Sequence, residues 1–196
     1  MLLRAQHYYT VEDYAGIEEG SPFKHEYYNG SVFVMAGASV RHNTISGNVF
    51  GELRAKLRGS GCQAFGSDMR IRTPGGLWTY PDVMVVCGEL QVRKEKGIEA
   101  ICNPRLLVEV LSDSTRDYDR NDKFALCRAI PDFCEYLLIE QDLLAVEQYV
   151  PGPHTDRAKK RSWKLRRHTA PAAPVKLASL PVELTFAEIY EQTGLI

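Results

Sequence analysis

Apolar residues follow two different spacings along this chain, and each spacing predicts a different kind of element. Four apolar residues recur at every fourth position between about residues 41 and 57, which is typical of one buried face of an α-helix. Residues 106–111 (LLVEVL) form an almost continuous apolar run, which predicts a strand buried on both faces. Glu109 interrupts that run, although a buried carboxylate needs a partner or a metal ion. The helical positions are Ile45, Val49, Leu53 and Leu57.

Turn and capping signals predict further helices and hairpins along the chain. The Asn-Gly pair at 29–30 lies between two β-rich segments, as in a two-residue hairpin. Thr10 and Thr185 are each followed three positions later by an acidic residue, the spacing of a capping box, so a short helix is expected after each. The turn Pro-Gly-Gly at 74–76 predicts a second hairpin.

The remaining segments complete the pattern of an α/β protein. Residues 88–103 are charged and weakly patterned, which predicts a loop. A helix is expected ahead of Pro131, followed by two strands around a tight turn at 141–142. The basic stretch at 158–168 is read as one more strand. This order predicts a mixed β-sheet flanked by helices, with an N-terminal helix and hairpin and extra C-terminal strands.

Composition narrows the class of protein but identifies no partner. The chain has 196 residues, which we interpret as one domain over 1–196, and its formal charge of −1 excludes a global field for nucleic acid. Its five cysteines are odd in number and form no C-x-x-C pair, so reduced thiols in the cytoplasm are expected, and neither a disulfide framework nor a zinc site. The chain shows no signal peptide or membrane-spanning run, which predicts a soluble protein.

Three segments place chemically useful side chains within reach of one another. Asp82 follows a proline at the start of the apolar run 83–86, and Glu109 lies in the run described above. Alternation of side chains puts each carboxylate on a defined face, so adjacent strands would bring the two together at one edge of a sheet. Lys123 lies on the helix that follows, and if its amine belongs to the same site it should face the sheet beside Phe124 and Cys127, with Arg120 and Asp122 toward water.

Two close carboxylates favour a cation between them. Mg²⁺ or Mn²⁺ suits Asp82 and Glu109 because such ions take oxygen ligands, and the backbone carbonyl of Val110 is a third candidate ligand. Lys123 would hold or deprotonate the attacking water and offset charge that develops on phosphorus. The pattern therefore predicts a phosphodiester-hydrolysing site.

The same segments, in order, resemble the bacterial Uma-two family, which carries a restriction-endonuclease description within the PD-(D/E)xK nuclease superfamily. The resemblance rests on "YPDVMVV", "PRLLVEVLSDST", "DYDRNDKFALCR" and "EYLLIEQD", together with "YTVEDY", "HEYYNG", "MAGASVRHN" and "FGSDMRIR". It covers roughly residues 8 to 150 and leaves 151–196 as a C-terminal extension. It implies a restriction-endonuclease-like fold, a DNA substrate, Mg²⁺ or Mn²⁺ and a homodimer, with no membrane and no obligate protein partner.

The resemblance also implies roles for individual residues. Asp82 resembles the superfamily's metal-binding aspartate and Glu109 its second carboxylate. The usual lysine two residues after that glutamate is replaced by Leu111, and Lys123 matches a lysine relocated to the following helix. Cys127 stands where the helix motif commonly has tyrosine.

Weaker candidates have alternative interpretations that the residues leave open. Glu26 either faces the same cavity, as the resemblance hints, or is an exposed hairpin glutamate. His42 falls on the apolar helix face and is either an accessory site residue or a core histidine. Asp68 is a further carboxylate, for which a salt bridge to Arg70 or Arg72 is expected.

The basic stretch "KKRSWKLRRH" is a candidate DNA contact. Its cationic side chains would bind phosphates while Trp163 stacks on a base, or the stretch is a solvated face. The residues proposed to touch DNA are Lys160, Arg161, Lys164 and Arg166.

Three functions compete on this evidence. The first is a metal-dependent DNA endonuclease, and the second is a non-catalytic nucleic-acid-binding or interaction module that keeps the nuclease fold, as the displaced lysine and Cys127 would suggest. A glycoside hydrolase with paired carboxylates is the third, and Lys123 counts against it because such sites need no lysine.

Overall fold

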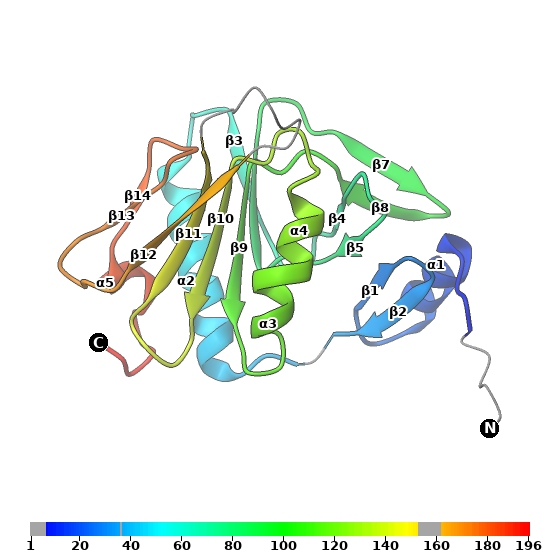
Figure 1. Cartoon of the computed structure of the whole chain (residues 1–196), viewed down its shortest axis with the longest axis horizontal. Coiled ribbons are helices and arrows are strands. Elements are labelled where there is room, and N and C mark those ends of the chain that lie inside the picture. Colours follow the sequence, from blue (N-terminus) through cyan, green and yellow to red (C-terminus); the bar gives the residue numbers. More distant parts are fainter. Residues whose placement is uncertain (1–6, 36, 153–161) are drawn as a thin grey trace.

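The computed structural model describes residues 7–35, 37–152 and 162–196, and its main body is a mixed six-stranded sheet covered by helices on both faces (Figure 1). The strand order in this main sheet is β12-β11-β10-β9-β6-β3, with β9 and β10 parallel and the other neighbours antiparallel. Its strands are β3 (Cys62–Gly66), β6 (Val83–Cys87), β9 (Leu106–Leu111), β10 (Glu135–Glu140), β11 (Val146–Pro151) and β12 (Trp163–His168).

A second six-stranded sheet lies beside the first and has the order β2-β1-β5-β4-β8-β7. It carries the N-terminal hairpin at one end and a charged hairpin at the other (Figure 1). Its strands are β1 (His25–Tyr28), β2 (Ser31–Val34), β4 (Ile71–Arg72), β5 (Trp78–Thr79), β7 (Val92–Glu95) and β8 (Ile98–Ile101).

Helices cover the main sheet on both sides, and two short strands pair near the C-terminus (Figure 1). The long helix α2 begins after the N-cap Ser39 and packs its four-residue repeat of apolar side chains against one face. A continuous helical segment, 116–127, packs on the opposite face. These elements are α1 (Val11–Gly20), α2 (Val40–Lys56), α3 (Arg116–Tyr118), η1 (Asp119–Lys123), α4 (Phe124–Cys127), α5 (Phe186–Ile189), β13 (Val175–Lys176) and β14 (Glu183–Leu184).

Most of the predicted elements are present. The Asn-Gly pair at 29–30 makes the β1–β2 turn with both residues at positive φ, and capping boxes begin α1 and α5. All six residues of β9 are buried, as the apolar run predicted. The fold is therefore the predicted α/β arrangement of a mixed sheet core flanked by helices.

One expectation about the fold was wrong. Residues 88–103 are not a loop, because β7 and β8 form a hairpin there around Lys96 and Gly97, which both have positive φ. The predicted second hairpin is present around the turn at 74–76 as β4 and β5, and its outer parts pair in the main sheet as β3 and β6. The expected helix ahead of Pro131 is present and ends at α4.

The cysteine prediction was also wrong for one pair. Cys62 and Cys87 are bonded in a disulfide and stand directly opposite each other on β3 and β6. Cross-strand register brought them together, and a separation of 25 residues along the chain gave no sign of it. Cys102, Cys127 and Cys134 are free thiols.

Candidate active site

Asp82 and Glu109 meet where β6 and β9 begin to separate. The antiparallel register pairs Val83 with Val108, so the next residue of each strand lies opposite the other. The Val110 backbone N–H donates to Asp82 Oδ2 at 2.7 Å, and the Asp82 backbone N–H donates to Glu109 Oε2 at 3.4 Å. The Asp82 carboxylate thus takes the place of a backbone acceptor in the ladder, and the predicted placement of Asp82 and Glu109 on adjacent strands is confirmed.

Glu109 is buried in an apolar layer. Its side chain shares a face of β9 with Leu107 and Leu111, which pack in the core beneath α4. Burial raises the pKa of the Glu109 carboxyl well above its usual value, and the nearby carboxylates of Asp119 and Asp82 raise it further. A free carboxylate here is costly, so the site favours a cation or a proton on Glu109.

Lys123 supplies one such cation from the facing helical segment. Its Nζ lies 2.8 Å from Glu109 Oε1 and 3.6 Å from both Glu26 Oε1 and Asp119 Oδ1. Burial alone would lower the pKa of this ammonium, but the three carboxylates outweigh that effect and hold it well above its usual value. Lys123 is therefore a protonated amine enclosed by acids.

Lys123 lies at the end of a π-helical turn, where the helical segment is wider than an α-helix. Residues 119–123 form a π-helical turn, an arrangement frequent at functional sites. Phe124 and Cys127 anchor the following turn in the core, and Asp122 is exposed, as predicted. The expectation that Arg120 points to water was wrong, because its guanidinium pairs with Glu140 at 2.6 Å and Glu147 at 3.1 Å.

His42 and Glu26 both lie at the site. His42 Nε2 is 3.3 Å from Asp82 Oδ2, while its Nδ1 is buried without a hydrogen bond. Burial lowers the pKa of the His42 imidazole, but Asp82 and the Val110 backbone outweigh it and raise the pKa overall. Glu26 is 7% exposed and accepts a hydrogen bond from the Thr79 hydroxyl, which excludes the exposed-hairpin interpretation.

Sequence reasoning missed Asp119. Its side chain is buried beside Lys123, four positions earlier in the chain, and burial raises the pKa of its carboxyl. The available signal was the acid–lysine spacing of four residues, which places both on one helical face. In the sequence that spacing is hidden within the charged stretch "TRDYDRNDK".

Other predicted candidates lie elsewhere. Asp68 is exposed and pairs with Lys24, so the predicted partners Arg70 and Arg72 were wrong. Lys164 and Arg166 are exposed on β12, an edge strand, whereas Lys160 and Arg161 lie outside the described residues. Charges on an edge strand also guard against pairing with another chain.

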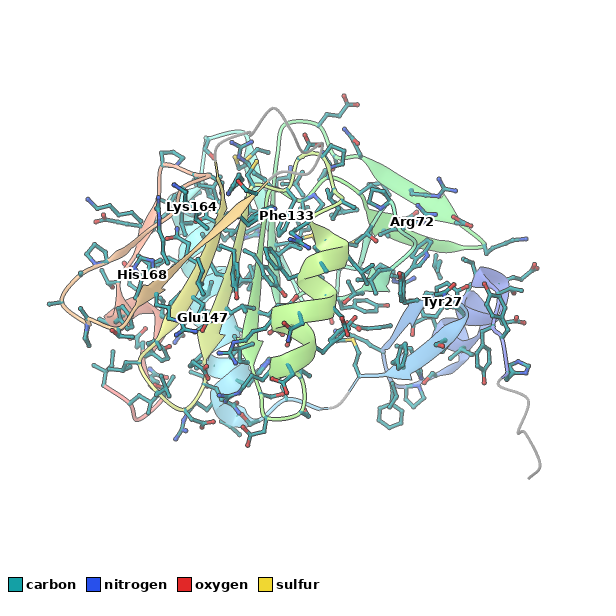
Figure 2. The ribbon with its side chains drawn as sticks, in the orientation of Figure 1. Tyr27, Arg72, Phe133, Glu147, Lys164 and His168 are labelled. Carbon is teal, nitrogen blue, oxygen red and sulfur yellow. A yellow bond between two sulfur atoms is a disulfide. The ribbon has the colours of Figure 1, made fainter. Side chains whose placement is uncertain are left out.

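Trp163 is not free to stack on a base. Its ring centroid lies 5.2 Å from those of both Phe124 and Phe133. Figure 2 shows Phe133 beside the helical segment, with Lys164 and His168 toward one end of the molecule and Tyr27 toward the other. The basic strand is therefore packed through its aromatic residue and lies three strands away from β9, roughly 14 Å at the usual strand spacing.

The donors at the site fit a hard divalent cation. Three carboxylates (Glu26, Glu109 and Asp119) gather around one ammonium, Asp82 lies beside Glu109, and Glu109 Oε1 is buried without a hydrogen bond of good geometry. Among the described residues, no three His, Cys, Asp or Glu side chains are arranged to hold one metal ion. A site built from two carboxylates, a backbone carbonyl and water needs no third side chain.

Known proteins resemble this chain over most of its length. The model of the Uma2 family, described as "Putative restriction endonuclease", matches residues 11–187. The chain belongs to the Uma2 family. Two proteins of Synechocystis sp., the uncharacterized proteins sll1609 and slr1290, are 32% and 36% identical over 88% and 71% of this chain and 94% and 73% of their own lengths.

A solved structure supports the fold of this Uma2 protein. A "putative nuclease belonging to DUF820" from Anabaena variabilis superposes with a TM-score of 0.71 over 91% of this chain and 98% of its own, at 17% identity. That similarity establishes a nuclease-like fold. Within the described ranges, none of the helices has the length and apolar character needed to span a bilayer.

Proposed function

We propose that this Uma2 protein is a Mg²⁺- or Mn²⁺-dependent DNA endonuclease that hydrolyses phosphodiester bonds. The observation that carries the proposal is the meeting of Asp82, Glu109 and Lys123 from two adjacent strands and the facing π-helical turn. Family membership and the nuclease-like fold support the same reaction class. We also propose that the protein forms a homodimer, whose two active sites would suit the two strands of DNA. We place it in the cytoplasm, where it would meet a DNA substrate.

Asp82, Glu109 and the Val110 carbonyl are the groups that would hold the metal ion. When bound, the ion would supply Lewis-acid activation of water and of the phosphoryl oxygen. The hydrogen bond from the Val110 N–H and the contact with His42 orient the Asp82 carboxylate, so its ligand geometry is set in advance. Glu109 is held by its buried strand.

Lys123 would act through its charge. Its raised pKa keeps the amine protonated at neutral pH, so the ammonium would stabilise negative charge that builds on the phosphoryl oxygens or donate a proton to the leaving oxygen. Glu26 and Asp119, both at 3.6 Å, hold the ammonium in place without saturating it. Pairing with Glu109 in the absence of substrate is compatible with this role.

The short ion pair also favours a second candidate, the non-catalytic module. Because Lys123 already compensates Glu109 at 2.8 Å, the site can remain stable without a metal ion. Under this alternative, the chain would bind a nucleic acid or a protein and would not require divalent metal.

A plasmid-nicking assay separates the two functions. The purified chain is incubated with supercoiled DNA in Mg²⁺, in Mn²⁺ or in EDTA, beside Asp82→Ala. The endonuclease proposal predicts nicking that needs the metal ion and disappears in the variant. Equal nicking by Asp82→Ala would point to a contaminating nuclease, and no nicking by the wild type under any metal would favour the module.

A further inference from the structure

Phe33 lies on the face of the N-terminal hairpin that also carries Glu26 into the active site. In β1 and β2 these two residues are direct cross-strand partners, so their side chains project from the same face of the sheet. Glu26 is buried against Lys123, whereas the Phe33 side chain is 55% exposed. An exposed aromatic ring therefore stands immediately outside a buried catalytic candidate.

A row of side chains across the second sheet confirms which face this is. Ile71 of β4 stands opposite Thr79 of β5, and the Thr79 hydroxyl donates to Glu26 of β1, whose partner on β2 is Phe33. Ile71 packs in the same core cluster as Phe124 of the helical segment. The row thus runs from the core, past the site, to solvent at the edge strand β2 (Figure 1).

The chemistry of this rim suits a nucleobase. The carboxylates of Glu26 and Asp119 beside the rim repel a phosphate, but they do not oppose the uncharged face of a base. Cross-strand partners stand about 5 Å apart, which is comparable with the ~3.4 Å rise per nucleotide of a DNA strand. A base one or two nucleotides from a phosphate held at the site can therefore reach the ring.

We propose that Phe33 stacks on a base of the DNA strand next to the phosphate held between Asp82, Glu109 and Lys123. This inference rests on the proposed function for its substrate and adds a base-contacting residue to it. Tyr28, 37% exposed and on the same hairpin face, extends the aromatic surface. Stacking of this kind tolerates any base sequence because every base has a π face.

The test measures DNA binding, separately from cleavage. Fluorescence anisotropy follows a short fluorescein-labelled DNA bound by the full chain in Ca²⁺, with single-stranded and duplex forms compared. Phe33→Ala is expected to weaken binding about 5- to 100-fold, the range for loss of one base stack, and Phe33→Trp is expected to bind like the wild type. Thermal unfolding of both variants should match the wild type.

Two neighbours provide matched controls. Val34 is 63% exposed on the same strand but points to the opposite face, and Phe23 is a 64% exposed aromatic residue outside the hairpin. Val34→Ala and Phe23→Ala should leave DNA affinity unchanged. Equal losses in either control, or unchanged affinity in Phe33→Ala, would overturn the inference, as would a wild type that binds no DNA.

The outcomes also separate this inference from the proposed function. Metal-dependent nicking together with Phe33-independent binding would overturn the stacking role alone. Phe33-dependent binding without any nicking would overturn the endonuclease and leave the stacking role standing. A change in molar mass of Phe33→Ala by light scattering would instead assign the ring to a contact between copies of this chain and overturn the inference.

Discussion

Two buried glutamates on the adjacent parallel strands β9 and β10 are compensated in opposite ways. Glu135 is fully buried and accepts hydrogen bonds from the backbone N–H groups of Ala178 and Ser179, the Ser179 hydroxyl and the Gln148 amide. Glu109, in contrast, has a charged neighbour in Lys123, two nearby carboxylates and an oxygen without a good hydrogen bond.

The difference separates a carboxylate that neutral donors satisfy from one that they do not. Neutral donors around Glu135 tie the segment at 178–179 to the sheet, and nothing there calls for a further ligand. The cluster around Glu109 carries excess negative charge and a raised carboxyl pKa, which is why Glu109 and not Glu135 is the candidate site residue. Burial of a charged residue alone would not have told the two apart.

The largest expected effect is on catalysis at Lys123. Lys123→Ala should lower kcat by about 10²–10³, the usual consequence of removing one electrostatic contact to the transition state, with DNA and metal binding retained. Lys123→Arg should rescue poorly because guanidinium lacks the compact ammonium geometry. Single-turnover nicking rates measure this, and an unchanged rate in the alanine variant would exclude the amine from the reaction.

The next effect is on stability and should separate the two glutamates. Glu135→Ala leaves several buried donors without an acceptor, so the free energy of unfolding should fall by about 3 kcal/mol. Glu109→Gln removes a buried charge but leaves Lys123 near Glu26 and Asp119, so stability should change by no more than about 1 kcal/mol. Urea unfolding measures the free energy of unfolding of both variants. Equal losses of stability would contradict the distinction between Glu109 and Glu135.

Divalent metal should stabilise the folded protein by binding near Glu109, and not near Glu135. At a free concentration of ten times its Kd, Mg²⁺ or Mn²⁺ should raise the free energy of unfolding by about 1.4 kcal/mol and Tm by roughly 3–6 °C. Asp82→Asn should abolish the shift, whereas Glu135→Gln should keep it from a lower starting Tm. Differential scanning fluorimetry gives the readout, and a metal shift that persists in Asp82→Asn would place the ion elsewhere.

The smallest effect concerns acid stability near Glu135. His168 pairs with Gln148, which also binds Glu135, and burial followed by Arg166 lowers the pKa of its imidazole. The unfolded chain therefore takes up the proton first as pH falls below about 6.5, and stability declines there. His168→Gln should remove this component, less than about 1 kcal/mol for a partly exposed ring. Unfolding curves at pH 7 and pH 5.5 compare the two proteins.

Local patterns were sufficient for part of the site. The position of Asp82 at a strand start and the burial of Glu109 followed from the apolar runs and from alternation, because these patterns act within a few residues. The same holds for helix α2 and for the Asn-Gly hairpin. The inward face of Lys123 was expected only from its match to a relocated lysine.

Only the tertiary structure decided how the separate pieces meet. The Cys62–Cys87 disulfide depends on strand register between distant segments, and the closeness of Lys123 to Glu26 and Glu109 depends on how the helical segment packs on the sheets. Glu109 and Glu135 likewise look alike in the sequence, as single acids beside apolar runs. Their difference arises from residues distant along the chain, Lys123 for one and Ser179 for the other, and packing of the whole chain brings those partners into place.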